Sequence, residues 1–408
     1  MRNYTRRFGK SLFATKEIVM LTKKRLFTPG PTMVPDRVRL AMAQEVMHHR
    51  KPEFKSLMGD IQKGLGNLFG TESPVLPLTA SGTGAMVAAV SALFTEKDTV
   101  LVIDGGKFAA RWAEICEEIG VSVVRHVVPW GQVVQGEDVA ALLDAHPEVT
   151  GVLGQLCDTS STVLYPVKDV AMVTRNRNVL YVVDGVSGVS MSPCPMDLWG
   201  IDCLITGSQK GLMLPPGLAF IALSERGWQK AEQIQGGRNF YFNVLKERDN
   251  YFKQQTCYTP AVSLLVGLAE SLAMFSETGL ENVFRKQWAL TRMVRDSMAV
   301  LGFEFLAQEN YAWGVTGVII PDGVKPSALL KHAASEYGIV LAAGQDATKD
   351  YVIRIGHMGW VDYADMLGCI HAFAASFRAC GGYLGCRNYL EAGMHAYEQA
   401  MIEGYPQY

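Results

Sequence analysis

Residues 53 to 206 alternate between helix-type and strand-type patterns, and this alternation constrains the fold more than any other feature of the chain. Apolar residues recur at helical spacing over 53–70. Short apolar runs typical of strands follow at 100–103, 121–127, 152–156, 180–184 and 203–206, with helical stretches such as 109–119 and 139–143 between them. Strands that alternate with helices favour a mainly parallel, doubly wound sheet with helices on both faces, so we predict an α/β fold.

The pattern changes after Pro260. Helices are expected at 261–275 and 280–301, then strand-type runs at 314–320 and 352–355, a helix at 363–377 and a last helix near 388–401. That order suggests a second, smaller α+β domain. We therefore predict a large domain over residues 26–278 and a small C-terminal domain over 279–408 that carries an extra terminal helix.

The composition narrows the class of protein and its partners. With 408 residues, 49% of them hydrophobic and 19% charged, the chain suits a soluble protein of about two domains. The formal net charge of −2 gives no reason to expect a nucleic-acid partner. No apolar run reaches the roughly 18 residues that a membrane-spanning helix needs. The eight cysteines are scattered without a CxxC pair, so we expect reduced thiols, a cytoplasmic location and no metal site.

The first 25 residues differ from the rest of the chain. They contain eight Lys or Arg residues and a single acidic residue, Glu17, without the long apolar core of a secretory signal. We interpret residues 1–25 as a basic N-terminal arm, or in part as residues ahead of a true start at Met20. An organelle transit peptide is the alternative.

Two strand-type runs lead into residues that can carry chemistry. Asp184 ends the run 180–184, and Lys210 follows the run 203–206 after a short polar turn. Because ligands on parallel sheets bind at the carboxyl ends of the strands, we expect this carboxylate and this amine at one edge. A lysine can form a Schiff base with an aldehyde, and a carboxylate can keep a pyridine nitrogen protonated. The pair therefore predicts a pyridoxal 5'-phosphate site.

A small-residue turn, Ser81-Gly82-Thr83-Gly84, opens a predicted helix at 85–93. Such a helix start offers backbone N–H groups, hydroxyls and the positive end of the helix dipole to a phosphate. The turn does not match a dinucleotide-binding fingerprint, because Val87 stands where the third glycine is required. This mismatch argues against a dehydrogenase.

Several segments in this order resemble the class V aminotransferases, a family of fold-type I pyridoxal phosphate enzymes that includes alanine–glyoxylate and serine–pyruvate aminotransferases. The resemblance covers about residues 26–378. It rests on the opening segment 26–32, the HRKPEF segment 49–54, the phosphate turn at Ser81, the loop 158–162 and the strand 351–356.

The resemblance implies a set of cofactor-binding residues. Lys210 would be the Schiff-base lysine and the general base that moves a proton between the substrate Cα and the cofactor, and Asp184 would pair with the pyridine nitrogen. Phe108 would stack on one face of the ring, with Val186 on the other, and Ser160 would contact the phenolic oxygen side. The phosphate would be held by Gln209 and by the turn Ser81, Gly82 and Thr83.

The resemblance also implies how the substrate binds. Arg354 would form two parallel hydrogen bonds to the α-carboxylate of the substrate, and Gly30 of the opening segment would lie beside it. A buried arginine is expected at position 354 because Val352, Ile353 and Ile355 surround it. His49, Arg50 and His357 are weaker candidates, and we assign them no role.

The chain departs from the family pattern in three places. The first is the segment 255–260, which differs from the Tyr/Thr-containing segment through which the family often contributes phosphate ligands from the neighbouring subunit. In this segment we assign Thr259 as the ligand that the neighbouring subunit of a homodimer contributes. Ser161-Thr162 stands where Thr-Gly is usual in the loop, and the helix after Gly382 is longer than in many members. The long helix, the loop and the segment 128–131 are reminiscent of ureidoglycine–glyoxylate aminotransferases.

We therefore expect a homodimeric aminotransferase that moves the amino group of a small α-amino acid (alanine, serine or aspartate) to glyoxylate or pyruvate by a ping-pong mechanism. A ureidoglycine–glyoxylate aminotransferase is one alternative. A lyase or desulfurase on the same fold is another, although Phe108 and Gln209 stand where desulfurases carry histidines. A non-catalytic cofactor-binding protein is a third, against which the intact Lys210, Asp184 and Arg354 argue.

Overall fold

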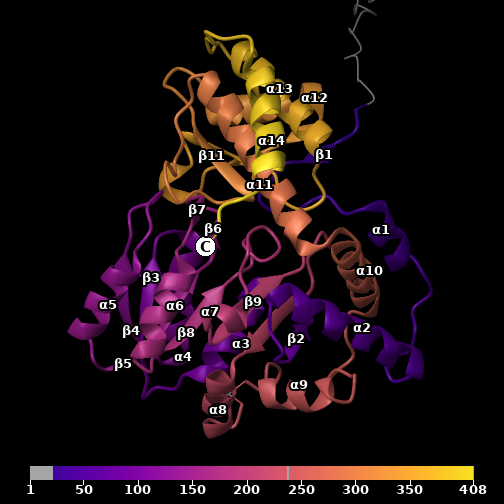
Figure 1. The fold of residues 1–408 in the computed structure, drawn as a ribbon, viewed down its shortest axis with the longest axis vertical. Coiled ribbons are helices and arrows are strands. Elements are labelled where there is room, and N and C mark those ends of the chain that lie inside the picture. Colours follow the sequence, from indigo (N-terminus) through magenta and orange to yellow (C-terminus); the bar gives the residue numbers. More distant parts are fainter. Residues whose placement is uncertain (1–21, 237–238, 408) are drawn as a thin grey trace, which may run out of the picture.

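A seven-stranded sheet forms the centre of the larger part of the molecule (Figure 1). The order is β2-β10-β9-β8-β5-β3-β4; the strands from β9 to β4 are parallel, and β10 is antiparallel to both of its neighbours. The computed structural model describes residues 22–236 and 239–407, and it confirms the predicted α/β class. The strands are β2 (Val75–Leu78), β3 (Thr99–Asp104), β4 (Ser122–Val127), β5 (Val149–Gln155), β8 (Leu180–Asp184), β9 (Cys203–Gly207) and β10 (Ala219–Leu223).

Helices cover both faces of this sheet, as the doubly wound prediction requires. Along β8, Val182 faces one apolar cluster, which includes residues of α3 (Gly82–Leu93) and α4 (Lys107–Ile119). The next residue, Val183, faces the other cluster, which includes residues of α2 (Pro52–Phe69) and α10 (Val262–Thr278). Alternate residues of a strand point to opposite faces, so an uninterrupted apolar strand is buried on both sides.

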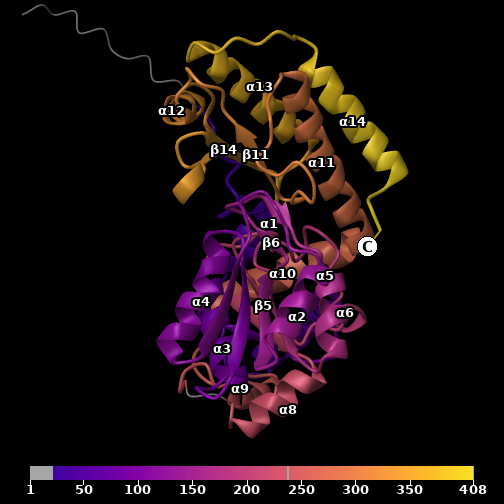
Figure 2. The same ribbon diagram turned by 90° about the vertical axis from the view of Figure 1, so that its left-hand side faces the viewer.

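The smaller part is built on a three-stranded antiparallel sheet, β11-β14-β13, made by β11 (Val315–Ile319), β14 (Val352–Gly356) and β13 (Ala342–Ala343). Its helices are α11 (Leu280–Val300), α12 (Pro326–Tyr337), α13 (Tyr363–Ala379) and α14 (Tyr389–Glu403). Figure 2 shows the terminal helix α14 lying along α11. The close approach depends on Gly393, because a Cβ atom there would come within 2.1 Å of the Ser297 hydroxyl.

The start of the described chain joins the smaller part of the molecule. Strand β1 (Arg25–Leu26) pairs in parallel with β12 (Ile339–Val340). Arg25 is the last residue of the predicted basic arm, and residues 1–21 of that arm lie outside the described residues.

The remaining elements connect these layers. They are α1 (Asp36–Met42), α5 (Gly136–Ala145), β6 (Cys157–Asp158), β7 (Val163–Leu164), α6 (Val167–Asn176), α7 (Met196–Trp199), α8 (Glu225–Gln233), α9 (Val244–Tyr251) and the 3₁₀ turn η1 (Asp346–Thr348). Within the described part of the chain, no helix is both long enough and apolar enough to cross a bilayer.

Candidate active site

Lys210 lies just beyond the carboxyl end of β9, and its side chain is buried, with 8% of the residue exposed. The ammonium group donates a hydrogen bond to the carbonyl oxygen of Pro29. Burial lowers the pKa of this amine from 10.5 to about 8, and the positive charge of Arg354 contributes in the same direction. About a tenth of such amines are neutral at pH 7, far more than at the ordinary pKa, and a nucleophile or proton acceptor must be neutral.

Asp184 ends β8, the neighbour of β9 in the sheet. Its carboxylate accepts a hydrogen bond of 2.8 Å from the backbone N–H of Val186. Burial raises the pKa of Asp184 to about 6, and this hydrogen bond opposes the rise. A cationic N–H partner would stabilise an ionised carboxylate held in such a place.

The turn Ser81-Gly82-Thr83 stands at the beginning of α3, where the first backbone N–H groups have no partner inside the helix. A glycine is needed at position 82 because Val186 lies close to it: a Cβ atom there would be 2.8 Å from Val186 Cγ2. Gln209 faces the same space, and its buried side-chain oxygen has no hydrogen-bond partner among the described residues. The turn and the Gln209 amide can together bind an anion such as a phosphate.

These groups surround one cavity of about 270 Å³ at the carboxyl end of the sheet. The predicted site residues that line it are Gly30, Ser81, Gly82, Thr83, Phe108, Asp184, Val186, Gln209 and Lys210. Gly30 has a φ of +91°, and a Cβ atom there would lie 2.4 Å from Lys210 Cδ, so the glycine makes room for the lysine side chain.

Ser160 does not line this cavity. Its hydroxyl donates a hydrogen bond of 2.6 Å to Asp158 Oδ1 and accepts one of 2.9 Å from the backbone N–H of Lys107. Asp158 Oδ2 in turn accepts the backbone N–H groups of Phe108 and Ala109, each at 3.2 Å. Ser160 and Asp158 therefore hold the first turn of α4, the helix that presents Phe108 to the cavity.

Arg354 lies on β14 of the smaller part, and 6% of the residue is exposed. Its guanidinium donates to the carbonyl oxygens of Ala343 (2.8 Å) and Thr159 (2.9 Å), and it does not line the 270 Å³ cavity. Burial lowers the pKa of Arg354 to about 10. In the described part of the chain no carboxylate forms an ion pair with it, so this buried cation has capacity for an anionic ligand.

Thr259 is exposed and lies away from the cavity of its own chain. It lines a small surface hollow with Thr79, Tyr241 and Tyr258. The structure thus separates this residue from the other predicted phosphate ligands of the same chain.

The three residues without an assigned role occupy supporting positions. His357 is fully buried between Thr316 and Gln287, and burial lowers its pKa to about 3. Arg50 donates hydrogen bonds to the carbonyl oxygens of Thr256 and Cys257, and His49 packs its ring edge-on against Phe54.

Three further residues of the site, Arg111, Asp158 and Cys157, were not predicted from the sequence. Arg111 and Cys157 line the cavity. The Arg111 guanidinium lies 5.1 Å from the centre of the Phe108 ring and donates a 3.2 Å hydrogen bond to the Thr83 hydroxyl. Arg111 follows Phe108 by three positions on a helix, and that spacing was the available signal.

The cavity fits pyridoxal phosphate in the chemistry of its walls. It offers an amine with a pKa of about 8, a buried carboxylate, a helix-start turn of backbone N–H groups beside the Gln209 amide, whose NH2 group can donate, and an aromatic and an aliphatic side chain. These match the aldehyde, the pyridine nitrogen, the phosphate and the two ring faces of that cofactor.

Comparison with known proteins agrees with this match. Residues 25–362 fit the family model described as Aminotransferase class-V. The serine–glyoxylate aminotransferase of Methylorubrum extorquens is 34% identical over 360 residues, covering 85% of this chain and 89% of that protein. The L-aspartate–glyoxylate aminotransferase of Paracoccus denitrificans is 31% identical over 350 residues, covering 83% of this chain and 87% of that protein.

A solved structure gives the same fold. The ureidoglycine–glyoxylate aminotransferase of Bacillus subtilis superposes with a TM-score of 0.87 at 24% identity, covering 94% of this chain and all of that one. The fold is therefore that of the fold-type I enzymes, as predicted. With the family match over most of its length, this chain belongs to the class V aminotransferases and is a pyridoxal phosphate-dependent transaminase.

Proposed function

We propose that this aminotransferase moves the amino group of a small α-amino acid (alanine, serine or aspartate) to glyoxylate or pyruvate by a ping-pong mechanism. The observation that carries the proposal is a buried Lys210 with a pKa of about 8, opposite Asp184 in one cavity and near the unpaired cation Arg354. The relatives named for serine–glyoxylate and aspartate–glyoxylate transfer support this choice of substrates.

Pyridoxal phosphate, when bound, supplies an aldehyde that condenses with amines and a ring that withdraws electrons from the substrate Cα. Lys210 would hold the cofactor and then, as a neutral amine, accept the proton from the substrate Cα and return it to the cofactor side. Asp184 would keep the pyridine nitrogen protonated. Arg354 would bind the substrate carboxylate and orient the Cα–H bond toward Lys210.

We further propose a cytoplasmic homodimer with shared active sites. Phe240 and Tyr241, with exposures of 75% and 44%, lie near Thr259, and Tyr241 stacks on Tyr258 at 5.1 Å. Exposed aromatic residues that gather in this way are typical of a surface that another protein covers. A second copy would bring Thr259 toward the phosphate of its partner.

The division of the chain into domains also stays a prediction. It consists of the basic arm (1–25), the large domain (26–278) and the small domain (279–408).

An absorbance spectrum of the purified protein tests the reaction. The cofactor band at the border of the visible range is expected to collapse with alanine, serine or aspartate and to return with glyoxylate or pyruvate. A band that changes without returning while ammonia or sulfide accumulates would instead support a lyase or desulfurase. Ureidoglycine as the best donor would support the ureidoglycine–glyoxylate alternative.

A further inference from the structure

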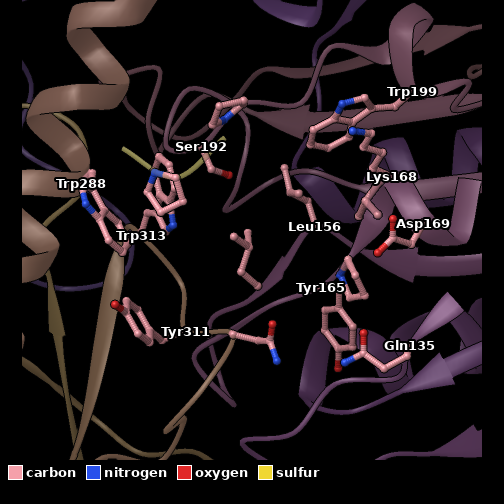
Figure 3. A pocket seen from close by; sticks show the side chains of 16 residues that line it. Gln135, Leu156, Tyr165, Lys168, Asp169, Ser192, Trp199, Trp288, Tyr311 and Trp313 are labelled. Atoms are coloured by element: carbon pink, nitrogen blue, oxygen red, sulfur yellow. The ribbon is translucent and has the colours of Figure 1, made fainter. Parts of the chain in front are cut away.

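A second cavity, of about 430 Å³, lies between the larger and the smaller parts of the molecule (Figure 3). Leu156, which follows β5, lines it, whereas the next residue, Cys157, lines the cofactor cavity. The two cavities are therefore separated by the chain segment that leads to Asp158 and Ser160. A cavity of this size can hold one small organic molecule.

Aromatic rings form the wall that the smaller part contributes. Trp288 of α11 stacks on Tyr311 with ring centres 5.8 Å apart and an angle of 5° between the planes, and it meets Trp313 at 5.0 Å. Figure 3 shows these three rings together on one side of the cavity. Such a wall offers apolar area and ring-to-ring contacts to a planar ligand.

A buried cation lies behind this wall. Arg295 follows Trp288 on α11 by seven residues, about two helical turns. Its guanidinium carbon is 3.7 Å from the centre of the Tyr311 ring. This contact already uses the electron-rich face of Tyr311, and the positive charge repels a second cation. The wall therefore favours a neutral aromatic ring over a quaternary ammonium group.

Opposite charges stand on the other side of the cavity. Lys168 and Asp169, in the first turn of α6, both line it, and Figure 3 shows them on the side away from Trp288, near Trp199. Neither side chain forms an ion pair or a hydrogen bond within the described residues. A half-buried ammonium and an exposed carboxylate on successive residues complement a ligand that carries a carboxylate and an ammonium on one carbon.

We propose that this cavity binds an aromatic α-amino acid. The aromatic ring packs against Trp288 and Trp313, the ligand carboxylate pairs with Lys168, and the ligand ammonium pairs with Asp169. Because the walls come from both parts of the molecule, the bound amino acid stabilises their present arrangement. The site differs from the substrate site, since Arg354 and Lys210 do not line it.

Isothermal titration of the holoenzyme with L-tryptophan tests the proposal. We expect saturable binding that is the same in wild-type protein and in Arg354→Gln, which removes the substrate-carboxylate group. Lys168→Gln and Asp169→Asn should each weaken binding about two- to fivefold, the effect of losing one solvent-exposed ion pair. Lys331→Gln, at an exposed lysine on α12, is the matched control and should leave binding unchanged.

Two analogues test the charge pattern on the wild-type protein alone, so the result does not depend on how the variants fold. Tryptamine lacks the carboxylate and indole-3-propionate lacks the ammonium, and both should bind more weakly than L-tryptophan. The proposal is overturned if no saturable binding occurs, if either analogue binds as tightly as L-tryptophan, or if Arg354→Gln abolishes binding while Lys168→Gln preserves it. Failure here leaves the transaminase assignment intact, because that rests on the family match and is tested separately by the cofactor band.

Discussion

At the scale of single residues, the charge of Asp184 lowers the stability of the cofactor-free protein but is expected to be needed for activity. Its pKa in the folded protein, about 6, lies above the ordinary 3.8. The folded state therefore binds the proton more tightly than the unfolded state does. The stabilisation from protonation is complete below about pH 4 and is lost as the pH rises through about 6. At neutral pH the cofactor-free protein thus carries a buried carboxylate that its fold does not favour.

Asp184→Asn should change the stability of the cofactor-free protein and the transaminase activity in opposite directions. Asparagine keeps an oxygen that can accept the Val186 N–H and removes the buried charge. We expect the cofactor-free variant to be more stable than the wild type at pH 7 by about 2–3 kcal/mol, from the free energy of a pKa shift of this size. Its transaminase activity should fall by about 100-fold or more, because the pyridine nitrogen loses its anionic partner. Urea denaturation at pH 7 and pH 4 measures the first effect, and the stability difference should fall to about 0.5 kcal/mol at pH 4.

The pKa values of Lys210 and Asp184 also predict how fast the cofactor-free protein takes up pyridoxal phosphate. Asp184 becomes ionised as the pH rises through about 6, and Lys210 becomes neutral as the pH rises through about 8. The rate of covalent uptake, followed by absorbance, should therefore rise through both values and level off above them. A single midpoint near 10.5, the ordinary value for lysine, would show that burial does not control this amine.

Arg354 should act on substrate binding more than on cofactor binding. Arg354→Gln removes the charge but can still donate one hydrogen bond, so we expect KM for the amino donor to rise about 10- to 100-fold. The cofactor band should persist, since Arg354 does not line the cofactor cavity. Steady-state kinetics with the donor varied give the KM change, and Arg378→Gln, an exposed arginine near the end of α13, is the control. Loss of the cofactor band instead would assign Arg354 to cofactor binding.

At the scale of elements, the first turn of α4 sets the position of Phe108 and Arg111. Ser160→Ala removes the hydroxyl that joins Asp158 to the Lys107 N–H. Because a buried N–H group then loses its partner, the free energy of unfolding should fall by about 1–2 kcal/mol. Cofactor affinity should fall as well, as equilibrium dialysis would show. Ser335→Ala, on the exposed face of α12, should change neither quantity.

The helices and parallel strands could be predicted because each has a periodic pattern of its own. The helix at 53–70 is α2, and the strand runs at 180–184 and 203–206 are β8 and β9. Strands β2 and β10 were missed. β2 contains Pro77, which weakens a strand pattern, and β10 joins the sheet antiparallel to β9, an arrangement that depends on tertiary pairing.

Part of the candidate site could also be predicted from the sequence, namely the residues at the ends of the strands. Asp184, Lys210 and the turn at Ser81 meet because the ends of parallel strands share one edge of the sheet. The Ser160–Asp158–Lys107 contacts depend on side-chain orientation, which no spacing rule gives. The Arg111–Phe108 contact, by contrast, could have been predicted from the helical spacing of the two residues.

At the scale of the whole molecule, the proposed homodimer with shared active sites predicts the activity of mixed dimers. Lys210→Ala and Thr259→Ala should each have low activity alone. In a mixed dimer, one site would combine the intact Lys210 of one subunit with the intact Thr259 of the other. An equal mixture, after subunits exchange, should recover about one quarter of wild-type activity, since half of the dimers are mixed and each has one complete site. No recovery above the sum of the two variants would contradict the assignment of Thr259 to the neighbouring site.

The chemistry of the active site depends above all on Lys210, the residue expected to bind the cofactor covalently. Borohydride reduction of the holoenzyme makes the link between lysine and pyridoxal phosphate permanent, and mass spectrometry of the peptides then locates it. We predict the added mass on the peptide that contains Lys210, and no added mass on any peptide of Lys210→Ala. A label on another lysine, or a labelled Lys210→Ala protein, would contradict the active site described above.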